Sequence, residues 1–254
     1  MRVVSAIAIN TAKECLRDKT VLVISIIAFV IMCASWAVHP LALGEGEKLT
    51  KDLGLGVISF FSLLVAIFSG TRLVYDEVER KSIYSVLSKP VRRWEFLLGK
   101  FLGLSLVIFG IVVILSVLFY VVQIVFLGSV DTYLLLGVFF IYLELVLVAQ
   151  IALLFSSFAT PIPSALFTFA LWFVGRASGD LLAFAKMLPP GIGRYLFYGV
   201  YYIVPNLSSL NISGMVVHHQ PVPPEQIIFA ISYTLLYITA LFCISVFIFD
   251  RREF

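Results

Sequence analysis

The chain has 254 residues, of which 61% are hydrophobic and only 13% are charged, and its net charge is +3. Soluble domains carry roughly 25% charged residues and about half apolar residues, so this composition excludes an ordinary globular protein. So small a net charge gives no sign of nucleic-acid binding. The three cysteines are an odd number and suggest neither a disulfide framework nor a metal cluster. The composition therefore indicates a polytopic membrane protein.

The N-terminal segment, residues 1–19, has the pattern of an amphipathic helix. Its apolar residues recur at helical spacing, and its charged residues fall mostly on the other faces. Val4, Ile7, Ala8, Thr11, Ala12, Cys15 and Leu16 form the apolar face. Such a helix is expected to lie along the inner membrane surface.

Six apolar segments are long enough to cross about 30 Å of hydrocarbon as helices. They are residues 20–38, 54–75, 96–127, 133–158, 164–185 and 226–249. The fifth of them is interrupted by Arg176 and Asp180. We therefore predict an all-α fold in which residues 1–254 form one transmembrane domain. Residues 186–225 are aromatic and broken by Pro and Gly, which favours short interfacial or re-entrant helices on the outer side.

The basic residues set the orientation. With the N-terminus inside, thirteen of them lie in cytoplasmic segments: four before the first span, seven around the loop between spans two and three, and two at the C-terminus. Four lie in the outer loops. Because Lys and Arg gather on the cytoplasmic side, both termini are predicted to be cytoplasmic.

The loop over residues 76–95 is the large cytoplasmic connection. The stretch from Asp76 to Lys100 holds ten of the 33 charged residues. Within it, Ile83, Val86 and Leu87 form a small apolar patch with Tyr84 on a predicted short helix, which Pro90 ends. Two interpretations are open: a solvated hairpin whose charges only fix the topology, or a surface that docks a soluble partner.

This loop, "DEVERKSIYSVLSKPVRRWEFLLGK", resembles the cytoplasmic loop of ABC-2-type transporter permeases. "KECLRDK" before the first span and "PNLSSLN" before the last are also similar to segments of that family. The similarity is greatest to the short-looped branch that includes the permease of the Nos copper-enzyme-maturation exporter. Many members carry Gly-Thr where this chain has Lys81-Ser82.

The resemblance implies that the loop helix is a coupling helix, which seats in a separate ATPase subunit. The residues given this role are Glu77, Glu79, Arg80, Ser82, Ile83, Tyr84, Val86, Leu87 and Pro90. The chain lacks a G-x-x-x-x-G-K-[ST] motif, since Trp94 stands where the first glycine before Gly99-Lys100 should be. ATP and Mg²⁺ are therefore expected on the partner, and this chain is expected to bind no cofactor or metal and to hold no catalytic site.

The family further implies export across a prokaryotic inner or plasma membrane. A second permease copy or a sister permease is expected, and the resemblance leaves room for an extracytoplasmic partner protein. The rival hypothesis is a secondary transporter driven by an ion gradient. That class usually shows inverted repeats and several intramembrane ionisable groups, and neither is evident here.

Charged residues inside the spans form the second candidate site. Glu144 and Arg176 lie at similar predicted depths, and an unpaired charge in hydrocarbon is costly. We predict an interhelical Glu144–Arg176 pair, with Asp180 as a competitor for Arg176. Its role is open between a structural staple and a lining of the substrate path, and a broken fifth span would instead let Arg176 reach the outer interface.

The remaining polar residues are interpreted as structural rather than as ligand-binding. Gln123 and Gln150 fit helix–helix hydrogen bonds better than substrate ligands. His39, His218 and His219 fit loop residues better than a metal site.

Overall fold

A computed structural model describes residues 2–35, 46–79, 92–128, 130–189 and 191–251 of the chain. These residues form helices, and no strand occurs among them. Within this described part, four single helices are long and apolar enough to cross a membrane, and two sharply bent helix pairs raise the number of candidate spans to as many as six. The predicted all-α, polytopic fold is thereby confirmed.

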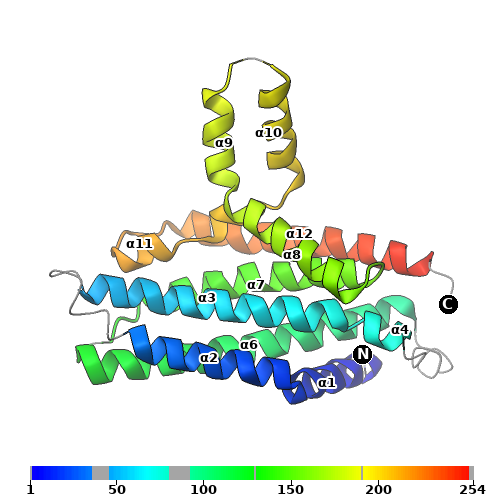
Figure 1. Cartoon of the computed structure of the whole chain (residues 1–254), viewed down its shortest axis with the longest axis horizontal. Helices are drawn as coiled ribbons and strands as arrows, with labels where there is room; N and C mark the ends of the chain where they lie inside the picture. The colour runs from blue at the N-terminus through cyan, green and yellow to red at the C-terminus, as the bar shows by residue number, and fades with distance from the viewer. Residues whose placement is uncertain (1, 36–45, 80–91, 129, 190, 252–254) are drawn as a thin grey trace.

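The long helices run side by side in one bundle (Figure 1). The bounds are Lys19–Ser35 for α2, Gly46–Arg72 for α3, Arg93–Leu127 for α6, Leu134–Ser156 for α7 and Pro224–Asp250 for α12. Helix α3 therefore begins earlier than the predicted span at residue 54. Its Leu63 and Ala66 are fully buried, as are Val148 and Ala149 of α7, because these two helices pack closely in the centre of the bundle.

Both ends of the loop over residues 76–95 lie at one end of the bundle, and we call it the loop end. Helix α3 ends there, the short helix α4 (Tyr75–Glu79) follows it, and α6 begins there. Helix α1 and the last turns of α12 lie at the same end (Figure 1).

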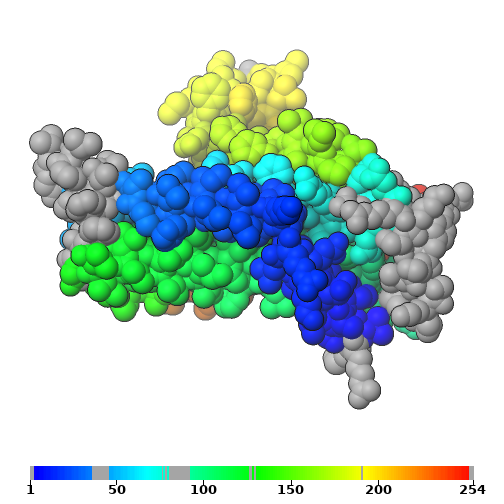
Figure 2. Space-filling view, turned by 60° about the horizontal axis from the view of Figure 1, so that its bottom comes forward, coloured from blue at the N-terminus to red at the C-terminus, as the bar shows by residue number. Residues whose placement is uncertain are grey.

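Helix α1 (Arg2–Arg17) turns away from α2 by 61° and packs on α6. Figure 2 shows it crossing beneath the bundle. The bend is at Asp18, whose carboxylate accepts a hydrogen bond from the backbone N–H of Thr20 at 2.8 Å and so caps α2. The buried residues Ala8, Thr11 and Cys15 belong to the predicted apolar face, whereas Leu16 is exposed. That face is therefore covered largely by α6.

The predicted fifth span, residues 164–185, is broken rather than continuous. It consists of α8 (Pro161–Arg176) and α9 (Ser178–Met187), which meet at 59°. With α10 (Ile192–Ile203), α9 forms a hairpin that projects sideways from the bundle (Figure 1). The chain then returns through a 3₁₀ turn, Ser208–Leu210, and α11 (Ser213–Val217).

The segment that returns to the bundle packs against the break between α8 and α9. The carbonyl of Gly175 accepts a hydrogen bond from the backbone N–H of Leu207 at 3.1 Å. A Cβ at Gly175 would lie 2.6 Å from the carbonyl oxygen of Pro205, so only glycine permits this approach. Hydropathy alone cannot reveal such a contact, because it depends on a segment thirty residues away in sequence.

Candidate functional site

The structure describes only the beginning of the predicted coupling segment. Glu77 and Glu79 lie in α4. The remaining predicted coupling residues lie outside the described residues: Arg80, Ser82, Ile83, Tyr84, Val86, Leu87 and Pro90. What the structure does describe is how the two ends of this segment are attached to the bundle.

The first attachment joins the α3–α4 corner to α7. The hydroxyl of Ser156 accepts hydrogen bonds from the backbone N–H groups of Val74 at 3.2 Å and Tyr75 at 3.3 Å. Both Ser156 and Val74 are fully buried. Since the first N–H groups of a helix have no helical partners, this hydroxyl satisfies the start of α4 and fixes the direction in which the chain leaves α3.

The second attachment is an ion-pair cluster around Lys100 of α6. The Lys100 side chain is only 2% exposed, and its ammonium pairs with the carboxylate of Glu77. It also lies 3.6 Å from the carboxylate of Glu14 on α1 and 5.9 Å from the centre of the Phe96 ring. A buried charge is tolerated when it is paired in this way. Lys100 thus connects α1, α4 and α6.

Sequence reasoning missed the role of Lys100, because it treated the residue as one of many loop-end cations. A signal was available. Lys100 lies seven residues inside α6 and is followed by an uninterrupted apolar run. A lysine at that position is costly unless it has a partner.

The third attachment joins the start of α6 to the end of α12. A guanidinium N–H of Arg93 donates to the carbonyl oxygens of Phe249 at 2.8 Å and Asp250 at 3.0 Å. The rings of Phe96 and Phe249 stack with their centres 6.0 Å apart. A cation at a helix C-terminus also interacts favourably with the helix dipole.

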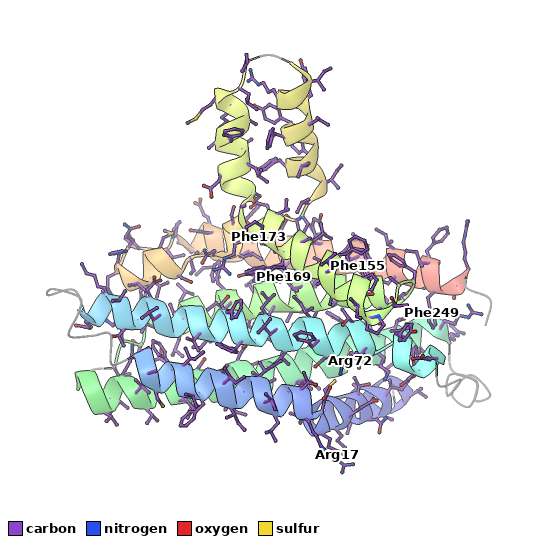
Figure 3. All side chains as sticks on the ribbon, in the orientation of Figure 1. Arg17, Arg72, Phe155, Phe169, Phe173 and Phe249 are labelled. Atoms are coloured by element: carbon purple, nitrogen blue, oxygen red, sulfur yellow. The ribbon has the colours of Figure 1, made fainter. Side chains whose placement is uncertain are left out.

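A polar cleft of about 750 Å³ lies at the loop end, between the α1–α2 bend and the ends of α3 and α4. Cations and anions alternate along its wall, and Arg72 lies 3.8 Å from Asp18 across it. Figure 3 shows Arg17 and Arg72 at this end of the bundle. The wall of the cleft therefore carries charges of both signs.

The second candidate site lies in the middle of the bundle, where the structure brings Glu144 and Arg176 together. Nη1 of Arg176 lies 3.2 Å from Oε1 and 3.4 Å from Oε2 of Glu144, which is only 1% exposed. The indole N–H of Trp172 donates to the same carboxylate at 2.8 Å, and Nη1 of Arg176 also donates to the hydroxyl of Ser59 at 3.2 Å. Asp180 is exposed on α9 and is not the ion-pair partner of Arg176 in the described part of the chain.

Asn206, within "PNLSSLN", organises the corner next to Arg176. Its side-chain oxygen accepts hydrogen bonds from the hydroxyls of Ser178 and Ser208, both at 2.8 Å, and from the backbone N–H of Ser209 at 3.2 Å. Its own backbone N–H donates to the hydroxyl of Tyr233 on α12 at 2.8 Å. Through these hydrogen bonds, Asn206 links α9, the 3₁₀ turn and α12.

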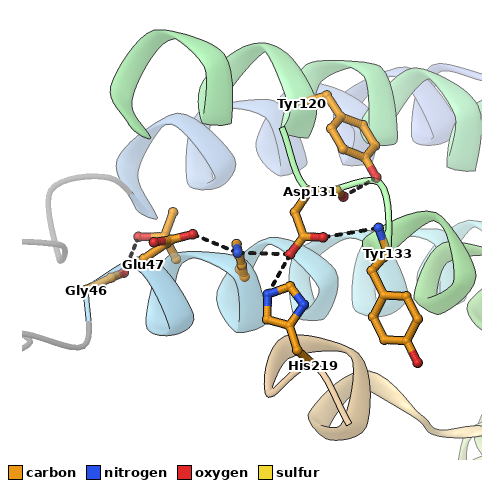
Figure 4. A network of polar contacts seen from close by, with 8 residues as sticks. Gly46, Glu47, Tyr120, Asp131, Tyr133 and His219 are labelled. Carbon is orange, nitrogen blue, oxygen red and sulfur yellow. Dashed lines mark hydrogen bonds and ion pairs between the residues drawn. The ribbon is translucent and has the colours of Figure 1, made fainter. Parts of the chain in front are cut away.

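A polar network closes the end of the bundle opposite the loop end (Figure 4). The buried ammonium of Lys51 pairs with Asp131 at 2.9 Å and with Glu47 at 2.7 Å, and Nε2 of His219 lies 3.2 Å from Asp131. Burial alone would raise the pKa of Asp131, but the hydrogen bonds from Lys51 and from the backbone of Tyr133, with the nearby cations, lower it below its usual range. His219 is thus engaged with a carboxylate.

Taken together, the apolar bundle and its internal ion pairs define a polytopic membrane protein whose helices are joined by paired charges. No group of three potential metal ligands occurs among the described residues. A family model described as "ABC-2 family transporter protein" matches residues 5–254, so the chain belongs to the ABC-2 family. It is an integral membrane protein and a permease of an ABC transporter, and membership implies partnership with an ABC ATPase. A search of the curated proteins finds no match.

Proposed function

We propose that this chain is the membrane-spanning subunit of an ATP-driven exporter and that the segment over residues 76–95 docks a separate ATPase. The observation that carries the proposal is the attachment of both ends of this segment to the bundle. Near the start of the segment, Glu77 is paired with Lys100, and near its end Arg93 donates to the last turn of α12. A loop that only fixed topology would not need buried anchors.

The anchors provide a route for force. A push on the segment between residues 80 and 91 would act on α7 through Ser156, on α1 and α6 through Lys100, and on α12 through Arg93. Packed interfaces of this kind switch between discrete arrangements rather than deforming continuously. ATP hydrolysis on the partner, with its Mg²⁺, would thereby reorient the spans, while this chain itself holds no catalytic site and no cofactor.

The remaining features of the assembly are part of the same proposal. The loop end faces the cytoplasm of a prokaryotic cell, in its inner or plasma membrane, with both termini on that side. A second copy or a sister permease completes a path between the two subunits, and the Nos-like branch is the working assignment within the family. An extracytoplasmic partner would bind at the opposite end.

Docking is tested by co-purification of the permease with its partner ABC ATPase. Tyr84→Asp and Leu87→Asp place a charge on the predicted apolar patch, and we expect each to abolish co-purification. Val130→Asp is the matched control, because it places the same charge on an exposed apolar residue between α6 and α7. Undiminished association of the Tyr84 and Leu87 variants would contradict the docking role.

Force transmission is tested separately with Lys100→Met, which removes the buried charge and keeps the apolar stem. Since Lys100 is not exposed, we expect the ATPase still to co-purify while stimulation of its ATPase activity by the permease falls several-fold. Lys186→Met, on the exposed surface of α9, is the control. If the permease alone moved solute under a proton or sodium gradient without nucleotide, an ion-gradient transporter would replace this proposal.

A further inference from the structure

A cavity of about 460 Å³ opens beside the Glu144–Arg176 pair. One wall is the half of α3 nearer its N-terminus, and the other is formed by Arg176, Asn211, Ser213 and Gly214. The polar network around Asp131 lies at this end of the bundle and not at the loop end. Neither the family nor the loop-end attachments give this cavity a ligand.

The cavity reaches the middle of the bundle. Ser59, which accepts a hydrogen bond from Arg176, is 13 residues from Gly46 (59 − 46) and 13 from Arg72 (72 − 59), so it is the midpoint of α3. At a rise of 1.5 Å per residue, it is about 20 Å from either end. Asp52 also lines the cavity, six residues from Gly46 (52 − 46), or about 9 Å by the same rise. The cavity therefore runs from near the end of the bundle to a guanidinium at mid-depth.

Only part of that guanidinium is used by the protein. A guanidinium has five N–H donors on three nitrogens. Nη1 donates to Glu144 and Ser59, whereas Nε and Nη2 donate to no residue in the described part of the chain. The Arg176 side chain is 28% exposed, and it lines the cavity. Its remaining donors are suited to carboxylate or phosphate oxygens, which guanidinium binds in a bidentate manner.

The rest of the lining is suited to hydrocarbon. Phe60 and Leu53 line the cavity and are exposed on the surface of α3. An apolar chain can therefore lie along them and enter from the lipid side. Asp52 stands near the mouth and opposes the entry of a small free anion from water, because like charges repel.

We propose that this cavity binds an anionic amphiphile, with its phosphate or carboxylate on Arg176 and its hydrocarbon along Phe60 and Leu53. Glu144 is the internal counter-ion that neutralises Arg176 when the cavity is empty and competes with the ligand for it. That the bound amphiphile is the exported substrate rests on the proposed function, whereas the binding itself does not.

Trp172 is a built-in reporter of this binding. Its indole donates to Glu144, and the Arg176 guanidinium lies 5.6 Å from its ring centre. In the full-length chain with Trp36→Phe and Trp94→Phe, Trp172 is the remaining tryptophan. Titration with dodecyl phosphate in neutral detergent micelles, without nucleotide or ATPase, should give a saturable change in its fluorescence. Arg176→Gln should weaken the apparent affinity roughly tenfold or more, because charged hydrogen bonds are lost.

The direction of the Glu144→Gln effect separates a ligand site from a structural staple. We expect this variant to bind dodecyl phosphate more tightly, because the internal competitor is gone, whereas a staple alone predicts no gain. The neutral double variant Glu144→Gln with Arg176→Gln avoids a buried unpaired charge and should not bind. Arg194→Gln on α10, away from the cavity lining, should bind like the parent.

Three results would overturn the proposal. They are equal binding by the double variant, equal binding of dodecyltrimethylammonium, and binding of inorganic phosphate as tight as that of dodecyl phosphate. The last would indicate a small-anion site instead. Since no ATPase is present, failure here leaves the exporter proposal intact, and failure of the co-purification test leaves this binding unaffected.

Discussion

At the scale of single residues, Asn206 shows how one amide can hold a broken helix. It is partly buried and gathers three hydrogen bonds on its side-chain oxygen, at the corner where α9 leaves the bundle. The residue is therefore structural.

Asn206→Ala should destabilise the protein markedly. Three hydrogen bonds are lost at about 1 kcal/mol each, so a loss of roughly 2–4 kcal/mol is expected. Thermal unfolding of the purified protein in detergent measures the change. Asn211→Ala is the matched control, because Asn211 is exposed and accepts one long hydrogen bond of 3.5 Å from Ser213. Equal melting temperatures for the two variants would contradict the role of Asn206.

The two buried glutamines differ in a way that sequence alone did not reveal. The side chain of Gln150 donates to the hydroxyl of Ser245 on α12 at 3.3 Å, in line with the predicted helix–helix bond. Gln123 is fully buried, and neither of its amide atoms has a partner within the described residues. For Gln123 the predicted helix–helix bond is therefore wrong in the described part of the chain.

Gln123→Met should raise the thermal stability. An unsatisfied buried amide costs about 1–3 kcal/mol, and methionine fills a similar volume without polar atoms. The same substitution at Gln150 should be less favourable, because it also removes the hydrogen bond that the Gln150 amide donates to the hydroxyl of Ser245. The melting temperatures of the two variants in the same detergent provide the comparison, and a fall for both would show that Gln123 is bonded in the native protein.

At the scale of elements, the packing of α1 on α6 depends on glycine. A Cβ at Gly103 would lie 2.6 Å from the carbonyl oxygen of Ala8 and 2.6 Å from Cβ of Thr11. Because a backbone oxygen cannot move aside as a flexible side chain can, any larger residue must separate the two helices. The amphipathic pattern in the sequence predicted which face of α1 is apolar. The close contact at Gly103 shows that α6 is the helix that covers this face.

Gly103→Ala should therefore expose Cys15, which lies on the buried face of α1. In a chain with Cys33→Ser and Cys243→Ser, we expect maleimide to label Cys15 several-fold faster in the variant than in the parent. Gly110→Ala, on the same helix, is the control, since a Cβ there meets no atom within 4 Å. Equal labelling of all three proteins would show that α6 accommodates the methyl group without moving α1.

Features that depend on one segment alone could be predicted from the sequence, whereas features that depend on contacts between segments could not. The Glu144–Arg176 pair could be predicted from the similar membrane depths of the two residues, because each depth depends only on the rise of a helix through a bilayer. The break at Ala177 and the cluster around Lys100 depend on contacts between distant segments. Charge counting and hydropathy treat each segment alone, so they could mark the fifth span as irregular but not say what bends it.

At the scale of the whole molecule, charged networks stand at both ends of an apolar bundle. The loop-end cluster joins α1, α4 and α6 through Lys100. At the opposite end, Asp131 joins α3 to the α6–α7 connection and, through His219, to the segment before α12. Tyr133 adds to this closure, because its hydroxyl donates to the carbonyl of Gln220 at 2.8 Å. A transporter that exposes a path alternately needs one end to open while the other stays closed.

The network around Asp131 should make the stability sensitive to acid in a defined range. The pKa of Asp131 is lower in the folded protein than the ordinary value of about 3.9. Its stabilising contribution is therefore complete above about pH 4 and is lost as the pH falls through the lower, folded-state pKa.

We expect Asp131→Asn to lower the melting temperature at pH 7 by an amount that stays constant down to about pH 5. Below about pH 4 the difference should shrink, because the wild-type carboxylate is protonated too. Asp52→Asn, at an exposed carboxylate on α3, should show no such pattern. A difference that shrank between pH 7 and pH 5 would contradict this assignment to Asp131.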